Sequence, residues 1–327
     1  MKILVTGSSG HLGEALMRTL KAQGKEVVGC DLRPSSFTDY TGDLADKSFA
    51  ERCMEGVNVV IHTATLHKPH VVTHSKQDFI NANISATLNL LEISVAQKVS
   101  AFLFTSTTST FGDAMQPGHE NEAVWVTEEL VPSPKNIYGV TKTAAEDLCQ
   151  IFHRNYDLPC LILRTSRFFP EEDDRATLRQ QYGNDNLKAN ELLHRRVDVA
   201  DVVEAHLLAI DKAPQIGFSK YIISATSPFQ QEQLKPLLTD APSVVEAIYP
   251  GFKALYAKQD WTMFPEIGRV YVNDKARNEL GWNPLYDFAH VLNCLRTNQP
   301  YTSELARQVG VKGYHKQQFE NGPYPVE

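Results

Sequence analysis

The sequence predicts an α/β fold: a doubly wound parallel β-sheet with helices on both faces, and a smaller C-terminal domain interleaved with it. Short apolar segments alternate with helical segments over the first two-thirds of the 327 residues. A glycine-rich turn joins the first apolar segment to the first helical one. Short buried strands alternating with helices are typical of a parallel sheet covered on both faces, and right-handed crossovers then wind the helices to both sides.

The expected elements alternate along the chain as such a fold requires. Strands are expected in short apolar runs, and helices where apolar side chains recur at helical spacing. The strands are Ile3–Thr6, Val27–Cys30, Val57–His62, Ala101–Thr105, Cys160–Arg164 and Tyr221–Ser224. The helices are His11–Gln23, Phe79–Gln97, Tyr138–Asn155 and Val197–Ile210. In the first helix, Leu12, Leu16 and Leu20 share one face, which suits packing on a sheet.

The pattern changes after Arg164. Pro170–Gln180 is charged and has no apolar period, and prolines are frequent from Ser227 onward. Two domains are therefore expected, and the second is interleaved with the first. The first spans residues 1–164 and is rejoined by 197–226, and the smaller one combines 165–196 with 227–327.

Composition narrows the class of protein. Apolar residues make up 42% and charged residues 22% of the chain, which is ordinary for a globular protein. A net charge of -7 argues against binding to nucleic acid, which needs a basic surface. No run approaches the roughly 20 apolar residues of a membrane span. The five scattered cysteines suit a reducing compartment, and the first strand leaves no room for a signal peptide. We therefore expect a cytoplasmic protein.

The first turn, Thr6-Gly7-Ser8-Ser9-Gly10-His11-Leu12-Gly13, has the spacing of a dinucleotide-binding site. Gly7 permits the tight turn, and Gly10 lets a pyrophosphate approach the backbone at a helix N-terminus. Gly13 allows the helix to pack closely on the strand. The sequence therefore predicts a bound dinucleotide.

Asp31 ends the second strand, where a carboxylate can accept hydrogen bonds from a ribose and repel a 2′-phosphate. This favours NAD over NADP. Arg33 lies close by and offers the alternative, accommodation of the phosphate. Asp43, in Gly42-Asp43-Leu44, is a candidate for contact with the adenine end of the cofactor.

Tyr138 and Lys142 are four residues apart in an expected helix, so they share one face. A free tyrosine has a pKa near 10, and a neighbouring lysine cation favours the phenolate. Such a tyrosine can act as general acid or base near neutral pH. Thr107 lies at the carboxyl edge of the expected sheet, where its hydroxyl would orient a reacting oxygen. The alternative for Tyr138 and Lys142 is an ordinary surface pair.

These motifs together resemble the extended short-chain dehydrogenase/reductases, the NAD-dependent epimerase/dehydratase family. The resemblance covers nearly the whole chain and implies a Rossmann fold. Its segments are Thr6–Gly13, Asp31, Asp43–Leu44, His62–Thr65, Asn83–Glu92, Thr105–Gly112 and Ala276–Pro284. It implies Thr107, Tyr138 and Lys142 as the catalytic triad. It implies a cofactor site formed by the glycine turn with His11 and Leu12, by Asp31, Asp43, Leu44, Thr63, Ala64, Thr65 and Asn83, and by Tyr138 and Lys142.

Departures from the family pattern reduce the number of activities that are expected for this chain. Thr108 and Ser109 stand where sugar-nucleotide 4,6-dehydratases carry an Asp-Glu pair, so that dehydration is not expected. Arg167 stands where sugar-nucleotide epimerases usually have asparagine. The cap over residues 171–196 is short, which favours a small sugar-like substrate over a bulky nucleotide sugar.

Three residues are expected to contact substrate: His67, Thr108 and Arg167. His67 belongs to the segment where the family places a substrate loop. Arg167 would bind a carboxylate or phosphate, or alternatively pair with the acidic run Glu171–Asp174. His67, His70 and His74 match no known zinc spacing, so no metal site is expected.

The leading functional prediction is an NAD-dependent oxidoreductase acting on a secondary alcohol or ketone of a sugar-like substrate. Two alternatives remain open: an epimerase that recycles tightly bound NAD, as UDP-glucose 4-epimerases do, and an NAD-binding regulator without catalysis. The family commonly dimerises through two helices per subunit, here Phe79–Gln97 and Tyr138–Asn155. The first carries the stripe Ile80, Ile84, Leu88 and Leu91, so a homodimer is expected, although the same stripe would also suit packing on the sheet.

Overall fold

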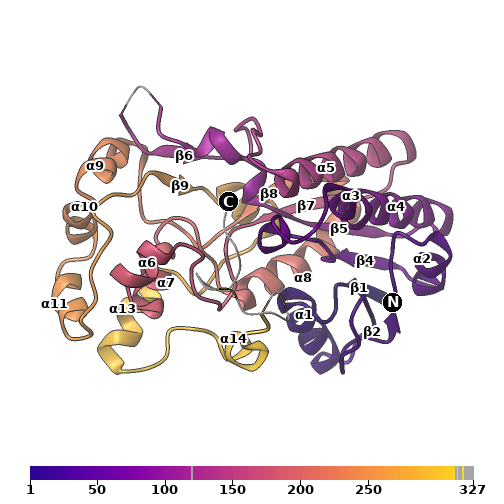
Figure 1. The fold of residues 1–327 in the computed structure, drawn as a ribbon, viewed down its shortest axis with the longest axis horizontal. Helices are drawn as coiled ribbons and strands as arrows, with labels where there is room; N and C mark the ends of the chain where they lie inside the picture. The colour runs from indigo at the N-terminus through magenta and orange to yellow at the C-terminus, as the bar shows by residue number, and fades with distance from the viewer. Residues whose placement is uncertain (119–120, 314, 316–318, 320–327) are drawn as a thin grey trace.

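The computed structural model describes residues 1–118, 121–313, 315 and 319, and a seven-stranded sheet runs through it (Figure 1). All of its strand pairs are parallel. In spatial order the strands are β3 (Tyr40–Thr41), β2 (Glu26–Asp31), β1 (Lys2–Thr6), β4 (Val59–His62), β5 (Ala101–Thr107), β7 (Cys160–Thr165) and β8 (Phe218–Ile223). The predicted doubly wound α/β fold is confirmed.

Strand residues alternate between two cores, one on each face of the sheet. In β1, Val5 packs into a core with α1 (His11–Ala22) and α8 (Val199–Ile216). Leu4 points the other way, into a core with α2 (Lys47–Met54), α4 (Ala86–Gln97) and α5 (Ile137–Tyr156). Because both faces are buried, the strands are apolar throughout, and this made them visible in the sequence.

β2 and β3 lie on one side of β1 in the sheet, and β4 and all later strands of this sheet lie on the other side. The direction in which the strands are added therefore reverses between β1 and β4. At such a reversal the loops after the two strands diverge and leave a crevice at the carboxyl edge of the sheet. The glycine turn follows β1 there, and residues 63–66 follow β4.

The expected helix over Phe79–Gln97 is longer and interrupted. It begins as α3 (Lys76–Ile80), whose N-cap Ser75 accepts a hydrogen bond from Asp78 N, and it passes through a π-helical turn before α4. The π turn spans Asn81–Ser85 and buries Asn83. Single π turns inside α-helices are frequent at functional sites.

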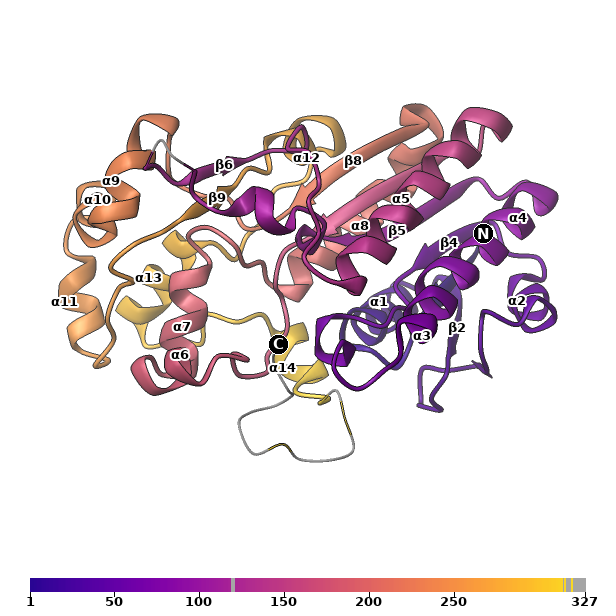
Figure 2. The ribbon, with the colours of Figure 1, turned by 45° about the horizontal axis from the view of Figure 1, so that its top comes forward.

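Short helices and one small sheet form the remainder, at one end of the main sheet (Figure 2). The small sheet pairs β6 (Val124–Val126) with β9 (Arg269–Tyr271) in parallel. The helices are α6 (Ala176–Gln181), α7 (Asn184–Glu191), α9 (Leu234–Thr239), α10 (Ala241–Ile248), α11 (Phe252–Ala257), α12 (Asp274–Leu280), α13 (Phe288–Thr297) and α14 (Glu304–Val309). β6 falls inside the predicted first domain yet pairs with β9, so one strand crosses the expected boundary. Otherwise the domain division stays a prediction.

None of the helices in the described ranges combines the length and apolar character that crossing a membrane requires.

Candidate active site

A cavity of about 980 Å³ lies at the carboxyl edge of the sheet, between the sheet and the short helices. Almost all of the predicted site residues line it. The lining residues predicted from sequence are Gly7, Gly10, His11, Leu12, Gly13, Asp31, Asp43, Leu44, Thr63, Ala64, Thr65, His67, Thr107, Thr108, Tyr138 and Arg167. Asn83 and Lys142 do not line it, because both lie beneath its wall.

The glycine turn has the geometry that its sequence requires. Gly7 has a φ of +69°, and a Cβ on Gly13 would lie 1.9 Å from the Gly7 carbonyl oxygen, so neither position accepts a side chain without rearrangement. Gly10 caps α1 without a side-chain hydrogen bond. The first-turn N–H groups of this helix therefore fit an anion such as the pyrophosphate of a dinucleotide.

A chain of buried hydrogen bonds connects the glycine turn to the π turn. Thr6 Oγ1 accepts bonds from the N–H groups of Thr63 and Ala64, both at 3.1 Å. Its own proton is then directed to His62 Nδ1, 2.7 Å away. His62 Nε2 lies 2.9 Å from Thr87 Oγ1, which donates to the Asn83 carbonyl oxygen. This sequence of donors requires a neutral His62, and burial lowers the pKa of His62 to about 3.

Neutral His62 makes stability dependent on pH. In the unfolded chain, histidine takes up a proton near pH 6.5, whereas the folded protein resists it down to about pH 3. Stability is therefore lost as the pH falls through this window, by up to about 1.4 kcal/mol per pH unit from this residue. We expect His62→Gln to flatten the pH dependence of the unfolding free energy, measured by urea titration between pH 6.5 and 4. The exposed His74→Gln is the control, and equal slopes in the two variants would contradict the account.

Asn83 holds the loop after β4 against α5. Its Oδ1 accepts bonds from Thr65 Oγ1 and Leu66 N at 2.9 and 2.8 Å. Its Nδ2 donates to the Leu66 carbonyl and to Thr141 Oγ1 at 2.9 and 3.0 Å. Asn83 therefore positions cavity walls, and direct contact with the cofactor stays a prediction.

Tyr138 lies at the start of α5 with only 8% of its surface exposed, and Thr107 ends β5 beside it. Thr107 lowers the pKa of Tyr138, but burial has the larger effect and raises that pKa to about 12. Lys142, which was expected to lower this pKa, is not among the groups that shift it. The tyrosine is a protonated phenol at neutral pH in this environment, ready to donate.

Lys142 is 2% exposed, and its Nζ donates to the Thr105 carbonyl oxygen at 2.7 Å. Burial lowers the pKa of Lys142 to about 7, against the opposing charge of Glu146. Glu146 is fully buried behind it and accepts bonds from Ser106 Oγ and from the Arg164 guanidinium, at 2.6 Å and 2.7 Å. Lys220 Nζ lies 3.1 Å from the same carboxylate. This cluster fixes β5, β7 and β8 to α5 directly below the cavity.

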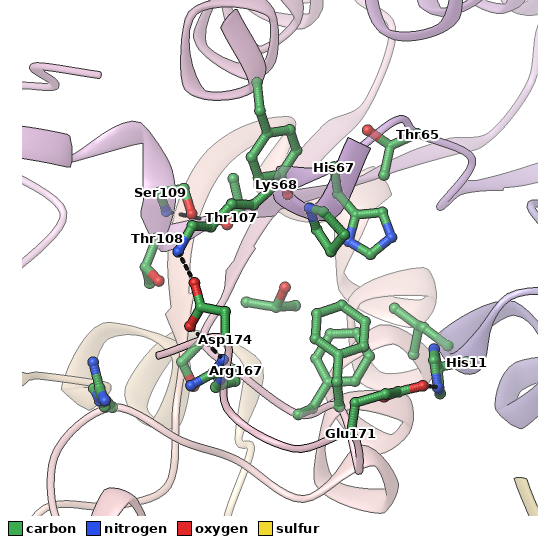
Figure 3. A pocket seen from close by; sticks show the side chains of 18 of the residues that line it. His11, Thr65, His67, Lys68, Thr107, Thr108, Ser109, Arg167, Glu171 and Asp174 are labelled. Atoms are coloured by element: carbon green, nitrogen blue, oxygen red, sulfur yellow. Dashed lines mark hydrogen bonds and ion pairs between the residues drawn. The ribbon is translucent and has the colours of Figure 1, made fainter. Parts of the chain in front are cut away.

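The loop after β7 crosses the cavity and pairs with both of its sides (Figure 3). His11 Nε2 lies 2.7 Å from Glu171 Oε1. Asp174 pairs with Lys68 and lies 3.5 Å from Arg167, which also pairs with Asp173. The structure thus gives Arg167 the ion pairs of the alternative interpretation, with the acidic run. Its contact with substrate stays a prediction.

His67 faces the reacting end of the cavity. Its ring lies 6.5 Å from that of Tyr138 and 5.4 Å from that of Phe169. Burial lowers the pKa of His67 well below its usual value, and the charge of His70 adds to this. Among the described residues, no group of three or more histidine, cysteine or acidic side chains is arranged to hold a metal ion.

The lining residues that were not predicted from the sequence include Ser166, His194, Arg195 and Arg269. Arg269 belongs to β9, and the segment before α8 is joined to it, because His194 Nδ1 lies 3.1 Å from the Arg269 carbonyl oxygen. These contacts join segments about 75 residues apart. No local motif contains these four residues, so sequence spacing alone could not identify them.

The fold and the site together define a dinucleotide-binding short-chain dehydrogenase/reductase. The chain belongs to the NAD dependent epimerase/dehydratase family, whose model matches residues 3–221. The resemblance drawn from the sequence motifs is thereby confirmed.

Individual relatives differ in name and in coverage. The chain is 24% identical to a UDP-glucose 4-epimerase of Streptomyces lividans over 86% of this chain and 91% of that protein. It is 25% identical to a uronate dehydrogenase of Pseudomonas syringae over 62% of this chain and 71% of that protein. It is also 27% identical to a dTDP-D-glucose 4,6-dehydratase of Dictyostelium discoideum, over 51% of this chain and 44% of that protein. Several matches thus span only about half of the relative's length.

Solved structures share the fold. A short-chain dehydrogenase/reductase superfamily protein from Agrobacterium tumefaciens, with bound NAD, superposes with a TM-score of 0.64 at 24% identity, covering 94% of this chain and 97% of that one. A UDP-glucose 4-epimerase from Thermotoga maritima gives 0.62 at 23% identity, covering 91% and 99%.

Proposed function

We propose that this protein catalyses hydride transfer between NAD and a secondary alcohol or ketone of a small sugar-like substrate. The observation that carries the proposal is that Tyr138 and Thr107 line the same cavity as the glycine turn, close enough for Thr107 to lower the pKa of Tyr138. The family to which the chain belongs is NAD dependent, and this supports NAD as the cofactor.

NAD supplies the hydride acceptor when it is bound, and the protein supplies proton transfer and positioning. The first turn of α1 and Asp31 would hold the pyrophosphate and the adenosine ribose. During reduction the protonated Tyr138 would donate its proton to the ketone oxygen, and during oxidation its phenolate would take the hydroxyl proton. Thr107 would orient the reacting oxygen, and the buried Lys142 would stabilise the phenolate that forms.

Asp31 supports NAD rather than NADP. Its carboxylate accepts hydrogen bonds from Ser9 N and Arg33 N at 3.0 and 2.9 Å, which hold it at the end of β2 beside the glycine turn. We expect Asp31→Ser to weaken NAD binding about tenfold and to improve NADP binding, because a carboxylate repels the 2′-phosphate. Titration of both cofactors tests this. A variant that keeps the original preference would contradict it. The control is Asp39→Ser, because the Asp39 carboxylate accepts a hydrogen bond from Gly29 N of the same strand but does not line the cavity.

An epimerase with the same site is the second candidate. Here the oxidised substrate stays bound and is reduced again on its other face. Two relatives that match nearly the whole chain carry the name UDP-glucose 4-epimerase, which favours this alternative. A regulator without catalysis is less favoured, because pure cofactor binding has no use for a buried tyrosine beside Thr107.

We infer that a 4,6-dehydratase is the wrong subclass. Thr108 and Ser109 lie in the turn after β5 where that chemistry uses an acid and a base. Neither hydroxyl can supply a carboxyl group. The relative named as a dehydratase matches only half of this chain.

The test is a screen of free sugars, sugar acids, sugar phosphates and nucleotide sugars with added NAD. Reduced-nicotinamide absorbance reports net oxidation, and product analysis by NMR reports epimerisation. Hydride chemistry on none of these classes would overturn the proposal.

We also propose a homodimer through α3, α4 and α5. Leu88 and Leu91 of the predicted stripe pack into the core, but Ile80 is 36%, Val140 48% and Ile151 41% exposed on these helices. Exposed apolar side chains grouped on two helices are typical of a subunit interface. We expect a dimer by analytical ultracentrifugation at micromolar concentration, and monomers after Val140→Asp with Ile151→Asp. A wild-type monomer would refute the dimer.

A further inference from the structure

One wall of the cavity contains buried polar atoms that have no hydrogen-bond partner in the structure. They are Ser166 Oγ, His194 Nε2, Arg195 Nε and Arg269 Nε. Ser166 and His194 are themselves 3% and 6% exposed. A buried polar atom left without a partner destabilises the folded protein, and native structures contain few of them. Four in one cavity wall indicate that a ligand completes their bonding.

The four atoms define the chemistry of that ligand. Serine hydroxyl and arginine Nε–H groups are donors. His194 Nδ1 donates to the Arg269 carbonyl oxygen, 3.1 Å away, so its Nε2 is an acceptor in the neutral ring. Burial and the charges of Arg195 and Arg269 lower the pKa of His194 well below its usual value, which keeps the ring neutral. The wall therefore offers donors to an anion and an acceptor to a hydroxyl.

The charges near this wall are predominantly positive. Glu191 is fully buried and pairs with Arg195, Arg196 and Arg167. Because Arg167 also pairs with Asp173 and Asp174, the Glu191 carboxylate is, among the described residues, the one partner that Arg195 and Arg196 share. Arg269 has no ion-pair partner in the described part of the chain; its guanidinium lies 5.8 Å from the centre of the Tyr271 ring. An anion beside Arg269 and Arg195 would be stabilised without displacing an existing pair.

The wall continues from the reacting end of the cavity. Thr107 and Thr165 are paired residues at the ends of β5 and β7. Ser166 follows Thr165, so it extends the same edge from the predicted catalytic threonine. A substrate whose hydroxyl reaches Thr107 and Tyr138 would therefore place its other end toward this wall.

Resting on the proposed function, we propose that Ser166, Arg195 and Arg269 bind an anionic group carried by the sugar itself, a carboxylate or a phosphate. His194 Nε2 accepts a hydrogen bond from a hydroxyl of the same sugar. The substrate is then an acidic monosaccharide or a sugar phosphate. A neutral sugar could accept hydrogen bonds from these donors but would leave the charge of Arg269 without a counter-charge.

Calorimetric binding to the NAD-loaded protein tests this with four probes: glucuronate, glucose 6-phosphate, glucose and UDP-glucose. We expect one of the first two to bind at least about tenfold more tightly than glucose, since charge-assisted bonds contribute roughly 1.4 kcal/mol or more. Arg269→Gln should weaken that binding about 10–100-fold and change glucose binding less than about twofold. The matched control is Arg277→Gln in α12, whose exposed side chain pairs with Asp274.

Ser166→Ala is the smaller change and should weaken the same ligand about threefold or more. An unchanged circular dichroism spectrum would show that each variant is folded, so that a loss of affinity can be attributed to the altered side chain in the cavity wall. Glucose binding as tightly as both anions, UDP-glucose as the sole ligand, or an Arg269→Gln effect no larger than that of Arg277→Gln would each overturn the inference. Tyr138-dependent oxidation of neutral sugars would overturn the proposal that the wall binds an anion and leave the proposed function intact. Anion binding without any hydride transfer would overturn the proposed function alone.

Discussion

Replacing Tyr138 with phenylalanine is expected to lower kcat about 10²–10⁴-fold, the usual contribution of general acid–base catalysis. The change removes the phenol oxygen beside Thr107 and leaves the ring in its buried place. NAD binding should stay within about twofold, because the glycine turn and Asp31 are untouched. Steady-state kinetics on the substrate found by the screen, with cofactor titration alongside, measures both quantities.

The control for this variant is Tyr156→Phe. Tyr156 lies at the other end of α5 and is 56% exposed, so the same chemical change there should leave turnover unaltered. Turnover within a few-fold of wild type in Tyr138→Phe would show that another group moves the proton.

Glu146→Gln is expected to destabilise the protein by about 3–5 kcal/mol, as for the loss of one partner from a buried ion pair. The Glu146 carboxylate is fully buried and accepts bonds from Arg164 Nη2 at 2.7 Å and Nε at 3.0 Å. Lys220 Nζ lies 3.1 Å away. A neutral amide leaves two cations without a counter-charge beneath the cavity. Urea unfolding measures the loss.

Glu92→Gln is the matched control. Glu92 pairs with Lys47 at the surface, where the side chains are 44% and 56% exposed, and such a pair contributes about 0–1 kcal/mol. Similar losses in the two variants would mean that the buried cluster is not a stabilising unit. Because the Glu146 charge raises the pKa of Lys142, Glu146→Gln also favours neutral Lys142.

The central sheet was predictable because its strands are buried on both faces. Every expected strand is present within a few residues of its predicted bounds, and the glycine turn lies at the carboxyl edge as its motif indicates. β3 has only Tyr40 and Thr41, both exposed, and thus gave no apolar signal. The first two-thirds of the chain therefore carried enough local information to specify the frame of the site.

The last third was less predictable for a physical reason. The helices α9 and α11 have six residues each, too short to show an amphipathic period and too short to be stable alone. They form because tertiary packing buries residues such as Leu237 and Phe252 in a shared core. The π turn at Asn83 is similarly invisible in sequence, since the side-chain bonds of Asn83 extend to residues 65, 66 and 141.

Local motifs led to residues that line the cavity, whereas lining residues that meet only in space were missed. Tyr138 and Thr107 were found from local spacing and order. His194 and Arg269 meet through the pairing of residues about 75 positions apart. Arg167 could be interpreted in two ways from sequence, and its ion pairs with Asp173 and Glu191 became visible only in the folded chain.

The most direct test of the central claim follows the hydride itself. The NAD-loaded protein is mixed with the identified sugar, deuterated at its reacting carbon, and quenched within a single turnover. We predict deuterium in the nicotinamide ring for wild type, and its arrival about 10²–10⁴-fold more slowly for Tyr138→Phe. Deuterium that remains on the sugar or exchanges into water while product forms would contradict hydride transfer as the function of this site.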